Sequence, residues 1–252
     1  MAKPISVQLY SLREASQDNF DGVLERLADI GYAGVEPYNL FGKTPVEFKR
    51  QVEDLGMRIS SSHFPWANHS PINEVIDVTA ELGLKRAAGG FGPDDFKNLD
   101  AVKHTAQTVN ELIEALKGAG LDLFLHNHWW EFAEIDGRLI YHILQELSPE
   151  VLFEVDTYWA ANFGAVDPVA EVRRVRDRAP LLHIKDGPLQ KDQAHVAVGD
   201  GKLNIAGIIE AADPDVLEWI IVELDACDTD MMTAIEQSYR YLTDNDLAQG
   251  QS

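Results

Sequence analysis

Acidic and imidazole side chains stand at or near the ends of four apolar segments of the sequence, where a buried charge needs a partner. The segments LFLHNHWWEF, VLFEVDTYW, LLHIKD and WIIVELD carry Glu131, Asp156, His183 and Glu223 in chain order. An unpaired charge in such surroundings costs several kcal/mol, and converging carboxylates raise one another's pKa unless a cation lies among them. We therefore predict that these residues bind a divalent metal.

The types of the predicted ligands indicate which metals suit the site. Three carboxylates and one imidazole are hard, oxygen-rich donors, which favour Mn²⁺, with Mg²⁺, Co²⁺ or Zn²⁺ as alternatives. His128 and Glu134, three residues before and after Glu131, are competing ligands at the first position. Each carboxylate alone would also suit a helix N-cap or a salt bridge, so the prediction depends on the whole set.

Further polar and aromatic residues near the same segment ends are candidates for substrate binding. Lys185 lies two residues after His183, so in a strand both side chains point to one side and Lys185 can reach a substrate oxygen. We assign His63 and His128 to substrate binding as well. Trp159 offers a flat face on which a sugar ring can stack. Three more tryptophans lie just past segment ends, namely Trp66, Trp129 and Trp130.

Simpler structural roles compete with several of these assignments. His128 could bond the backbone at a strand end, and Lys185 could form a salt bridge with Asp186 or Glu223. Glu36 and His126 are weaker candidates for the site. The segment GDGKLN at 199–204 predicts a plain turn that leads into a helix.

Short apolar runs and amphipathic stretches alternate along the chain and must position these residues. Glycines end several of the amphipathic stretches, as in DIGYAGVE and ELGLKRAAGG, which is typical of a helix that feeds a strand. The predicted strands are 5–9, 34–38, 58–62, 85–90, 121–126, 151–156, 181–185 and 219–224. The predicted helices are 19–30, 45–55, 71–82, 100–118, 138–147, 167–178, 204–212 and 230–243.

Strict alternation of strand and helix predicts an α/β fold, a single (β/α)8 TIM barrel with eight parallel strands, over one domain of residues 1–252. The alternative is an open doubly wound sheet, but the glycine-rich turn expected after its first strand is missing. In a barrel the carboxyl ends of the strands meet at one mouth, which would bring the predicted ligands together.

Composition limits the partners of the protein. The 42 acidic and 21 basic side chains give a formal net charge of −21, which repels nucleic acid and anionic membranes. No apolar run approaches the roughly 18 residues of a membrane span. Cys227 is the only cysteine, so we expect a cytoplasmic protein without disulfides. The sequence leaves open a homo-oligomer or a hetero-oligomer with another subunit.

The ordered motifs VQLYSLR, GYAGVE, HNHWWEF, EVDTYW, LLHIKD and VELD resemble the sugar isomerase and epimerase family of the xylose-isomerase-like TIM barrels. The resemblance covers nearly the whole chain. It implies a small-molecule carbohydrate substrate and a metal held by Glu131, Asp156, His183 and Glu223. Ketohexose epimerases of this superfamily usually have a histidine where this chain has Trp159, which disfavours simple 3-epimerisation of a free ketose.

The resemblance implies proton abstraction next to a carbonyl of a keto-sugar or sugar derivative, through a metal-stabilised enediolate, with Glu131 and Glu223 as acid and base. One alternative is a metal-dependent lyase that eliminates the aglycone from a 3-keto-glycoside. Another is a catalytically silent partner subunit, and a third is a hydrolase that uses its carboxylates directly. The AP endonuclease branch is disfavoured because it needs a basic DNA-binding face.

Overall fold

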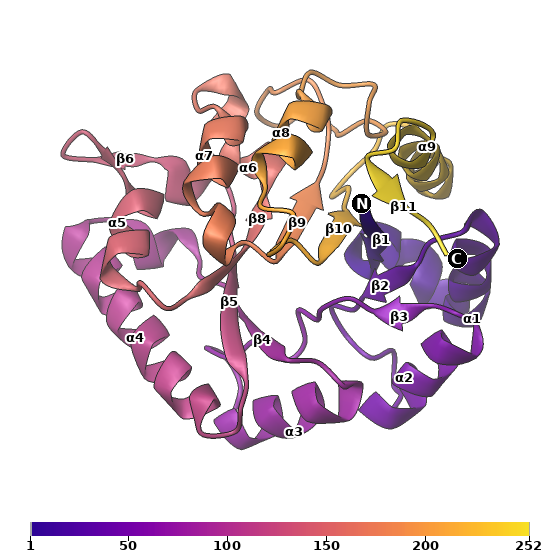
Figure 1. The fold of residues 1–252 in the computed structure, drawn as a ribbon, viewed down its shortest axis with the longest axis horizontal. Helices are drawn as coiled ribbons and strands as arrows, with labels where there is room; N and C mark the ends of the chain where they lie inside the picture. The colour runs from indigo at the N-terminus through magenta and orange to yellow at the C-terminus, as the bar shows by residue number, and fades with distance from the viewer. Residues whose placement is uncertain (1, 252) are drawn as a thin grey trace.

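The computed structural model describes residues 2–251, and its main sheet is a curled wall of parallel strands (Figure 1). The strand order is β3-β2-β1-β10-β9-β8-β5-β4, so neighbours in sequence are neighbours in the wall, except for β3 and β4 at its two edges, once the short strands β6 and β7 are set aside. The prediction of a (β/α)8 barrel is confirmed. The eight barrel strands are β1 (Lys3–Gln8), β2 (Gly34–Glu36), β3 (Arg58–Ile59), β4 (Arg86–Gly89), β5 (Asp122–His126), β8 (Leu152–Asp156), β9 (Leu181–Ile184) and β10 (Trp219–Val222).

Helices surround the wall on its outer side, as Figure 1 shows. Their ends follow the sequence signals: Thr44 and Glu47 form a reciprocal capping box at the start of α2, and Gly31 and Gly83 end α1 and α3 in the left-handed conformation. The helices are α1 (Arg13–Ile30), α2 (Pro45–Asp54), α3 (Ile72–Leu82), α4 (Leu99–Lys117), α5 (Ile140–Leu147), α6 (Thr157–Ala160), α7 (Pro168–Arg174), α8 (Ile205–Ala211) and α9 (Met231–Asp244). No helix among the described residues is long and apolar enough to cross a membrane.

The structure differs from the sequence prediction at the edges of the wall. Strand β3 is only two residues long and forms no ladder with β4; instead Ala67 N donates to Ala88 O at 2.8 Å. A short strand, β11 (Ala248–Gln249), pairs with β1, and β6 (Glu134–Ile135) and β7 (Arg138–Leu139) form a separate hairpin. A strand was predicted over 58–62, where β3 is shorter, but β6, β7 and β11 were not predicted, because strands of two residues carry no periodicity.

Alternating strand residues divide the barrel interior into apolar and polar levels. The amino-terminal level is an apolar cluster of Ala33, Ala88, Phe124, Leu181, Trp219 and Ile221. Two residues further along β8 and β9 the inward positions become Glu154 and His183, and two residues further still they become Asp156 and Lys185. The strands therefore carry their polar side chains toward their carboxyl ends, where active sites of this architecture lie.

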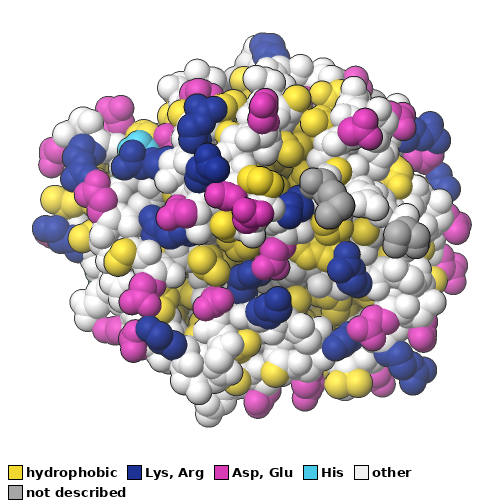
Figure 2. Space-filling view, in the orientation of Figure 1, with side chains coloured by type: hydrophobic (Ala, Val, Ile, Leu, Met, Phe, Trp, Pro, Cys, Tyr) yellow, Lys and Arg dark blue, Asp and Glu magenta, His cyan; other side chains and the backbone are white. Residues whose placement is uncertain are grey.

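Charged side chains of both signs are interspersed on the face of the molecule in Figure 2, and that face has no continuous basic patch. The mixture of signs gives a polyanion no obvious surface to bind on this side.

Candidate active site

Two groups of buried ionisable side chains lie inside the carboxyl end of the barrel. We call Asp156, Lys185 and Glu223 the upper layer, and the side chains beneath them the lower layer. The lower layer consists of Glu36, His63, His126, Glu154 and His183. All eight side chains are buried, and His183 touches both layers.

The upper layer is centred on Lys185. Its Nζ lies 2.8 Å from Asp156 Oδ2 and 2.8 Å from Glu223 Oε2, and it donates to Asp225 Oδ2 at 2.7 Å. Asp156 Oδ1 accepts from Trp159 N at 2.9 Å, so one oxygen does cap the short helix α6. The other oxygen, Oδ2, is buried and has no well-aligned hydrogen bond to the described residues, although Lys185 is close. Such an atom is suited to a metal ion.

Burial and neighbouring charges act in opposite directions on the upper layer. Burial outweighs the nearby Lys185 and raises the pKa of Asp156 to about 6. Burial also acts to raise the pKa of Glu223, but Lys185 and His183 together outweigh it and hold that pKa well below the usual range. Burial lowers the pKa of Lys185, yet Asp156, Asp225 and Glu223 more than offset this, so the ammonium stays charged.

The lower layer is a connected hydrogen-bond network. His183 Nδ1 bonds Glu223 Oε2 at 2.8 Å, and its Nε2 bonds Glu36 Oε2 at 2.7 Å. His63 Nε2 bonds Glu154 Oε2 at 2.5 Å. Burial would lower the pKa of His183, but Glu154, Glu36 and Glu223 raise it well above its usual value. The network fixes the rotation of the His183 ring, the role that outer partners play for metal-binding histidines.

Two sets of buried side chains bring ligand atoms within 4.8 Å of one another. One is His126, Asp156, His183 and Glu223; the other is His63, His126, Glu154 and His183. The first contains three of the four predicted ligands. The fourth member of this set is His126 and not Glu131. His126 is the last residue of β5, and the sequence indicated it only as a weak candidate.

Glu131 is buried beside the upper layer without joining either set. It lies in a 3-10 turn after β5, and its Oε2 accepts from His128 N at 3.0 Å. Burial, followed by the nearby charge of Asp156, raises its pKa to about 8 despite that bond. Glu134 is exposed in the β6–β7 hairpin, so the structure places it away from the buried set.

The two histidines predicted to bind substrate occupy different positions. His63 is in the lower layer, bonded to Glu154 and beneath the upper layer. The His128 ring stacks on Trp130 with centroids 4.2 Å apart. Burial, followed by the charge of Lys185, lowers the pKa of His128 to about 4, so its imidazole is neutral.

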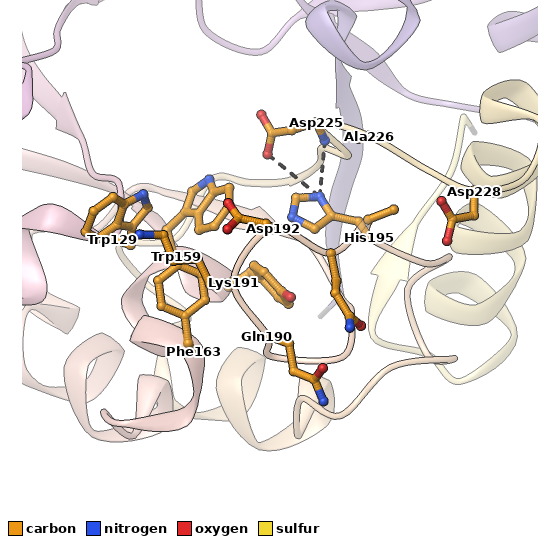
Figure 3. Close-up of a pocket in the computed structure, with 13 residues that line it drawn as sticks. Trp129, Trp159, Phe163, Gln190, Lys191, Asp192, His195, Asp225, Ala226 and Asp228 are labelled. Carbon is orange, nitrogen blue, oxygen red and sulfur yellow. Dashed lines mark hydrogen bonds and ion pairs between the residues drawn. The ribbon is translucent and has the colours of Figure 1, made fainter.

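A cavity of about 530 Å³ opens beside the upper layer (Figure 3). Its aromatic lining includes Trp129, Trp159 and Phe163, and its edge includes Asp225, the partner of Lys185. The Lys185 Nζ lies 5.3 Å from the centre of the Trp159 ring, so the charged groups of the upper layer lie next to the cavity wall. By contrast, Trp130 donates to Phe91 O and Trp66 packs on the apolar cluster.

Three residues that support the site were not assigned from the sequence. Asn127 in HNH accepts from Asp156 N at 3.0 Å and donates to Asp156 O at 3.1 Å, which locks the end of β5 to the end of β8. Glu154 contacts three imidazoles. It lies two residues before Asp156, and because alternate residues of a strand point to the same side, its inward direction could have been predicted from the sequence. His195 lines the cavity from a loop.

Comparison with known proteins places this geometry in a family. The model of the xylose isomerase-like TIM barrel family matches residues 24–244. A sugar phosphate isomerase/epimerase from Parabacteroides distasonis ATCC 8503 superposes with a TM-score of 0.83 and 26% identity, over 99% of this chain and 96% of that one.

More distant structures share the fold alone. An L-ribulose 3-epimerase has a TM-score of 0.70 and 16% identity, over 98% of this chain and 95% of that one. The probable 3-DHS dehydratase AsbF of Bacillus anthracis has a TM-score of 0.73 and 14% identity, over 95% and 98%. No curated protein sequence matches the chain. Because the fold serves both an epimerase and a dehydratase, the reaction must be argued from the site.

Proposed function

Because the chain belongs to the xylose isomerase-like TIM barrel family, we propose that it is a divalent-metal-dependent sugar isomerase or epimerase. The observation that carries this proposal is the convergence of Asp156, His183 and Glu223 on one buried spot beside an aromatic cavity. A small carbohydrate fits such a cavity because flat aromatic faces stack on sugar rings while charged groups bind the oxygens. From the single cysteine we also propose a cytoplasmic location.

We propose that the metal is held by Asp156, His183 and Glu223, with His126 as the fourth donor in place of Glu131. The buried Asp156 Oδ2, which has no aligned hydrogen bond to the described residues and pairs only with the Lys185 ammonium, supports this fit. Two nitrogen and two oxygen donors suit Mn²⁺, Co²⁺ or Zn²⁺, and Mn²⁺ remains our first expectation. A bound divalent cation would supply Lewis-acid stabilisation of the charge that develops on the substrate oxygens during proton abstraction.

The residues around this centre can bind the sugar and move the proton. Lys185 is charged and can donate to a substrate oxygen where it now contacts Asp225. Glu131 and Glu223 come from different strand ends, so we assign them as the acid and base that act on the carbon next to the carbonyl. His128 and Trp159 complete the predicted contacts to the sugar.

The proposal is tested by deuterium wash-in from D₂O into a panel of aldoses, ketoses and 3-keto-glucosides with Mn²⁺ present. Replacing the base should lower exchange at the reacting carbon, so Glu223→Gln and Glu131→Gln should each lose about a thousandfold in rate. Glu134→Gln is the matched control, because this exposed carboxylate should leave the rate unchanged. Wild-type rates in both buried variants would refute the acid and base assignment.

A lyase is the second candidate, because the cavity of about 530 Å³ leaves room for a second ring beside a sugar. Release of the aglycone from a 3-keto-glucoside would distinguish it from an epimerase. A catalytically silent partner subunit would give no exchange into any sugar. A hydrolase that uses carboxylates directly would keep its activity in a chelator.

A further inference from the structure

The loop between β9 and α8, residues 187–203, is held rigidly beside the cavity. Asp186 Oδ1 accepts from the backbone N–H groups of Gly187 and Leu203, and Oδ2 accepts from those of Gly199 and Gly201, at 2.8 to 3.1 Å. A Cβ at Gly201 would lie 2.0 Å from Asp186 Oδ1, so only glycine fits there. The GDGKLN segment is therefore more than a plain turn, because it closes around a buried carboxylate.

This loop presents His195 to the cavity. His195 N donates to Ala226 O at 2.9 Å, and the side chain is only 3% exposed. Its ring packs edge-on against Tyr158, with centroids 4.6 Å apart, and lies 5.4 Å from the Trp159 ring. In Figure 3 the ring reaches from the loop toward Trp159. Packing on two aromatic rings leaves the imidazole little freedom to turn.

The backbone fixes the tautomer of His195. Asp225 N donates to His195 Nδ1 at 3.1 Å, so Nδ1 must be the acceptor and the ring proton must be on Nε2. Burial, followed by the charge of Lys185, lowers the pKa of this imidazole to about 4, which keeps it neutral. The cavity wall thus carries an uncharged N–H donor.

The charged groups that line the cavity are mostly acidic. They are Asp192, Asp225 and Asp228, against one lysine, Lys191. Lys191 lies over the Trp129 ring at 5.3 Å, and the neighbouring Lys185 is already surrounded by three carboxylates. A phosphate group entering this cavity would meet a surplus of negative charge, whereas a hydroxyl would not.

We propose that the cavity selects an uncharged sugar over a sugar phosphate, and that His195 is a specificity-determining residue whose Nε2–H donates to a hydroxyl or ether oxygen of that sugar. The inference rests on the proposed function, because it requires a sugar at this site. It adds the substrate class and a recognition residue that the family relationship does not supply.

The test uses two sugar pairs: D-fructose with D-fructose 6-phosphate, and L-ribulose with L-ribulose 5-phosphate. Binding to the Mn²⁺-loaded protein is followed by tryptophan fluorescence, since Trp129 and Trp159 line the cavity. Wild type should bind at least one neutral sugar about tenfold or more tightly than its phosphate. His195→Asn and His195→Phe remove the Nε2 donor and should weaken binding of that sugar about tenfold. His195→Gln, which can place an amide N–H near the same point, should stay within about threefold of wild type.

Each outcome decides one of the two claims. Tighter binding of the phosphates, or equal binding by all three His195 variants and wild type, overturns the inference. An equal loss in the Asn, Phe and Gln variants also overturns it, because that pattern indicates a packing role. If the neutral sugars bind as expected but no deuterium is exchanged into them, the proposed function fails and the recognition claim stands. If neither neutral ketose binds, the recognition claim fails, and the proposed function then depends on exchange into the other sugars of the panel.

Discussion

The upper and lower layers of the site use the same kinds of side chain but are connected differently. In the lower layer each carboxylate faces imidazoles, for example Glu154 with His63 at 2.5 Å, and the group is sealed beneath the mouth. In the upper layer Asp156 Oδ2 has an ion pair with Lys185 but no aligned hydrogen bond to any described residue, and Lys185 also reaches Asp225 at the edge of the cavity. Both layers keep buried polar atoms without an aligned hydrogen bond in the described part of the chain, namely Glu154 Oε1 and His126 Nδ1 in the lower layer and Asp156 Oδ2 in the upper layer. The difference is access, because Lys185 of the upper layer contacts Asp225 at the edge of the cavity, where a sugar would bind.

The comparison predicts that substitutions in the upper layer remove chemistry, whereas substitutions of the lower-layer residues outside the proposed metal set, Glu36, His63 and Glu154, act mainly on stability. The largest effect is expected for Asp156→Asn, which keeps the volume but removes a charged metal donor. Sugar turnover should fall about a thousandfold or more, and the metal content should fall with it. Turnover assays and elemental analysis check this, with circular dichroism to show that the fold is retained. Full metal content with full activity in this variant would show that Asp156 is not a metal ligand.

In the lower layer we expect Glu154→Gln to act mainly on folding. The variant removes one buried counter-charge from His63 and from His183, which keep Glu36 nearby, and breaking a buried pair costs about 3 to 5 kcal/mol. Urea unfolding measures the loss. Glu171→Gln is the control, because its partner His142 lies outside the mouth and is partly exposed, so the loss should be about 1 kcal/mol. An equal loss in the free energy of unfolding of the two variants would contradict the structural role assigned to the lower layer.

Lys185→Met should have an intermediate effect on activity. The ammonium is the charged donor of the upper layer, and a hydrogen bond to a charged group contributes about 1.5 to 3 kcal/mol, so kcat/KM should fall between about tenfold and a hundredfold. Metal content should be unchanged or higher, because two carboxylates lose a competing cation. Loss of metal at unchanged kcat/KM would show that Lys185 supports the metal centre rather than the substrate.

The last prediction concerns the pH dependence of stability and leaves turnover aside. Because the pKa of Glu131 is raised to about 8 in the fold, its contribution is fully present below about pH 4.5 and is lost as the pH rises toward 8. Metal-free Glu131→Gln protein should therefore lose less stability than wild type between pH 5 and about 8. Urea unfolding in chelator at several pH values measures the two slopes. Parallel slopes would show that Glu131 is ionised throughout.

Sequence reasoning predicted the barrel because predicted strands and helices alternate along the whole chain. The family match and the structure confirm this fold. It predicted that Asp156, His183 and Glu223 converge, because each interrupts an apolar run, and these side chains do lie together; that they bind a metal stays a prediction. It made His126 only a weak candidate, since the direction of a side chain at the end of β5 depends on the twist of the wall. It also missed His195, whose position depends on a loop folded around Asp186 and has no periodic signal.

The central claim is that the upper layer uses a bound divalent cation to exchange a proton next to a sugar carbonyl. The most direct measurement is deuterium wash-in from D₂O into the best sugar of the panel, made on purified protein, after chelation and after return of Mn²⁺. We predict exchange that chelation abolishes and Mn²⁺ restores, in proportion to one bound metal per chain. Exchange that persists in the metal-free protein, or no exchange with metal bound, would contradict the account.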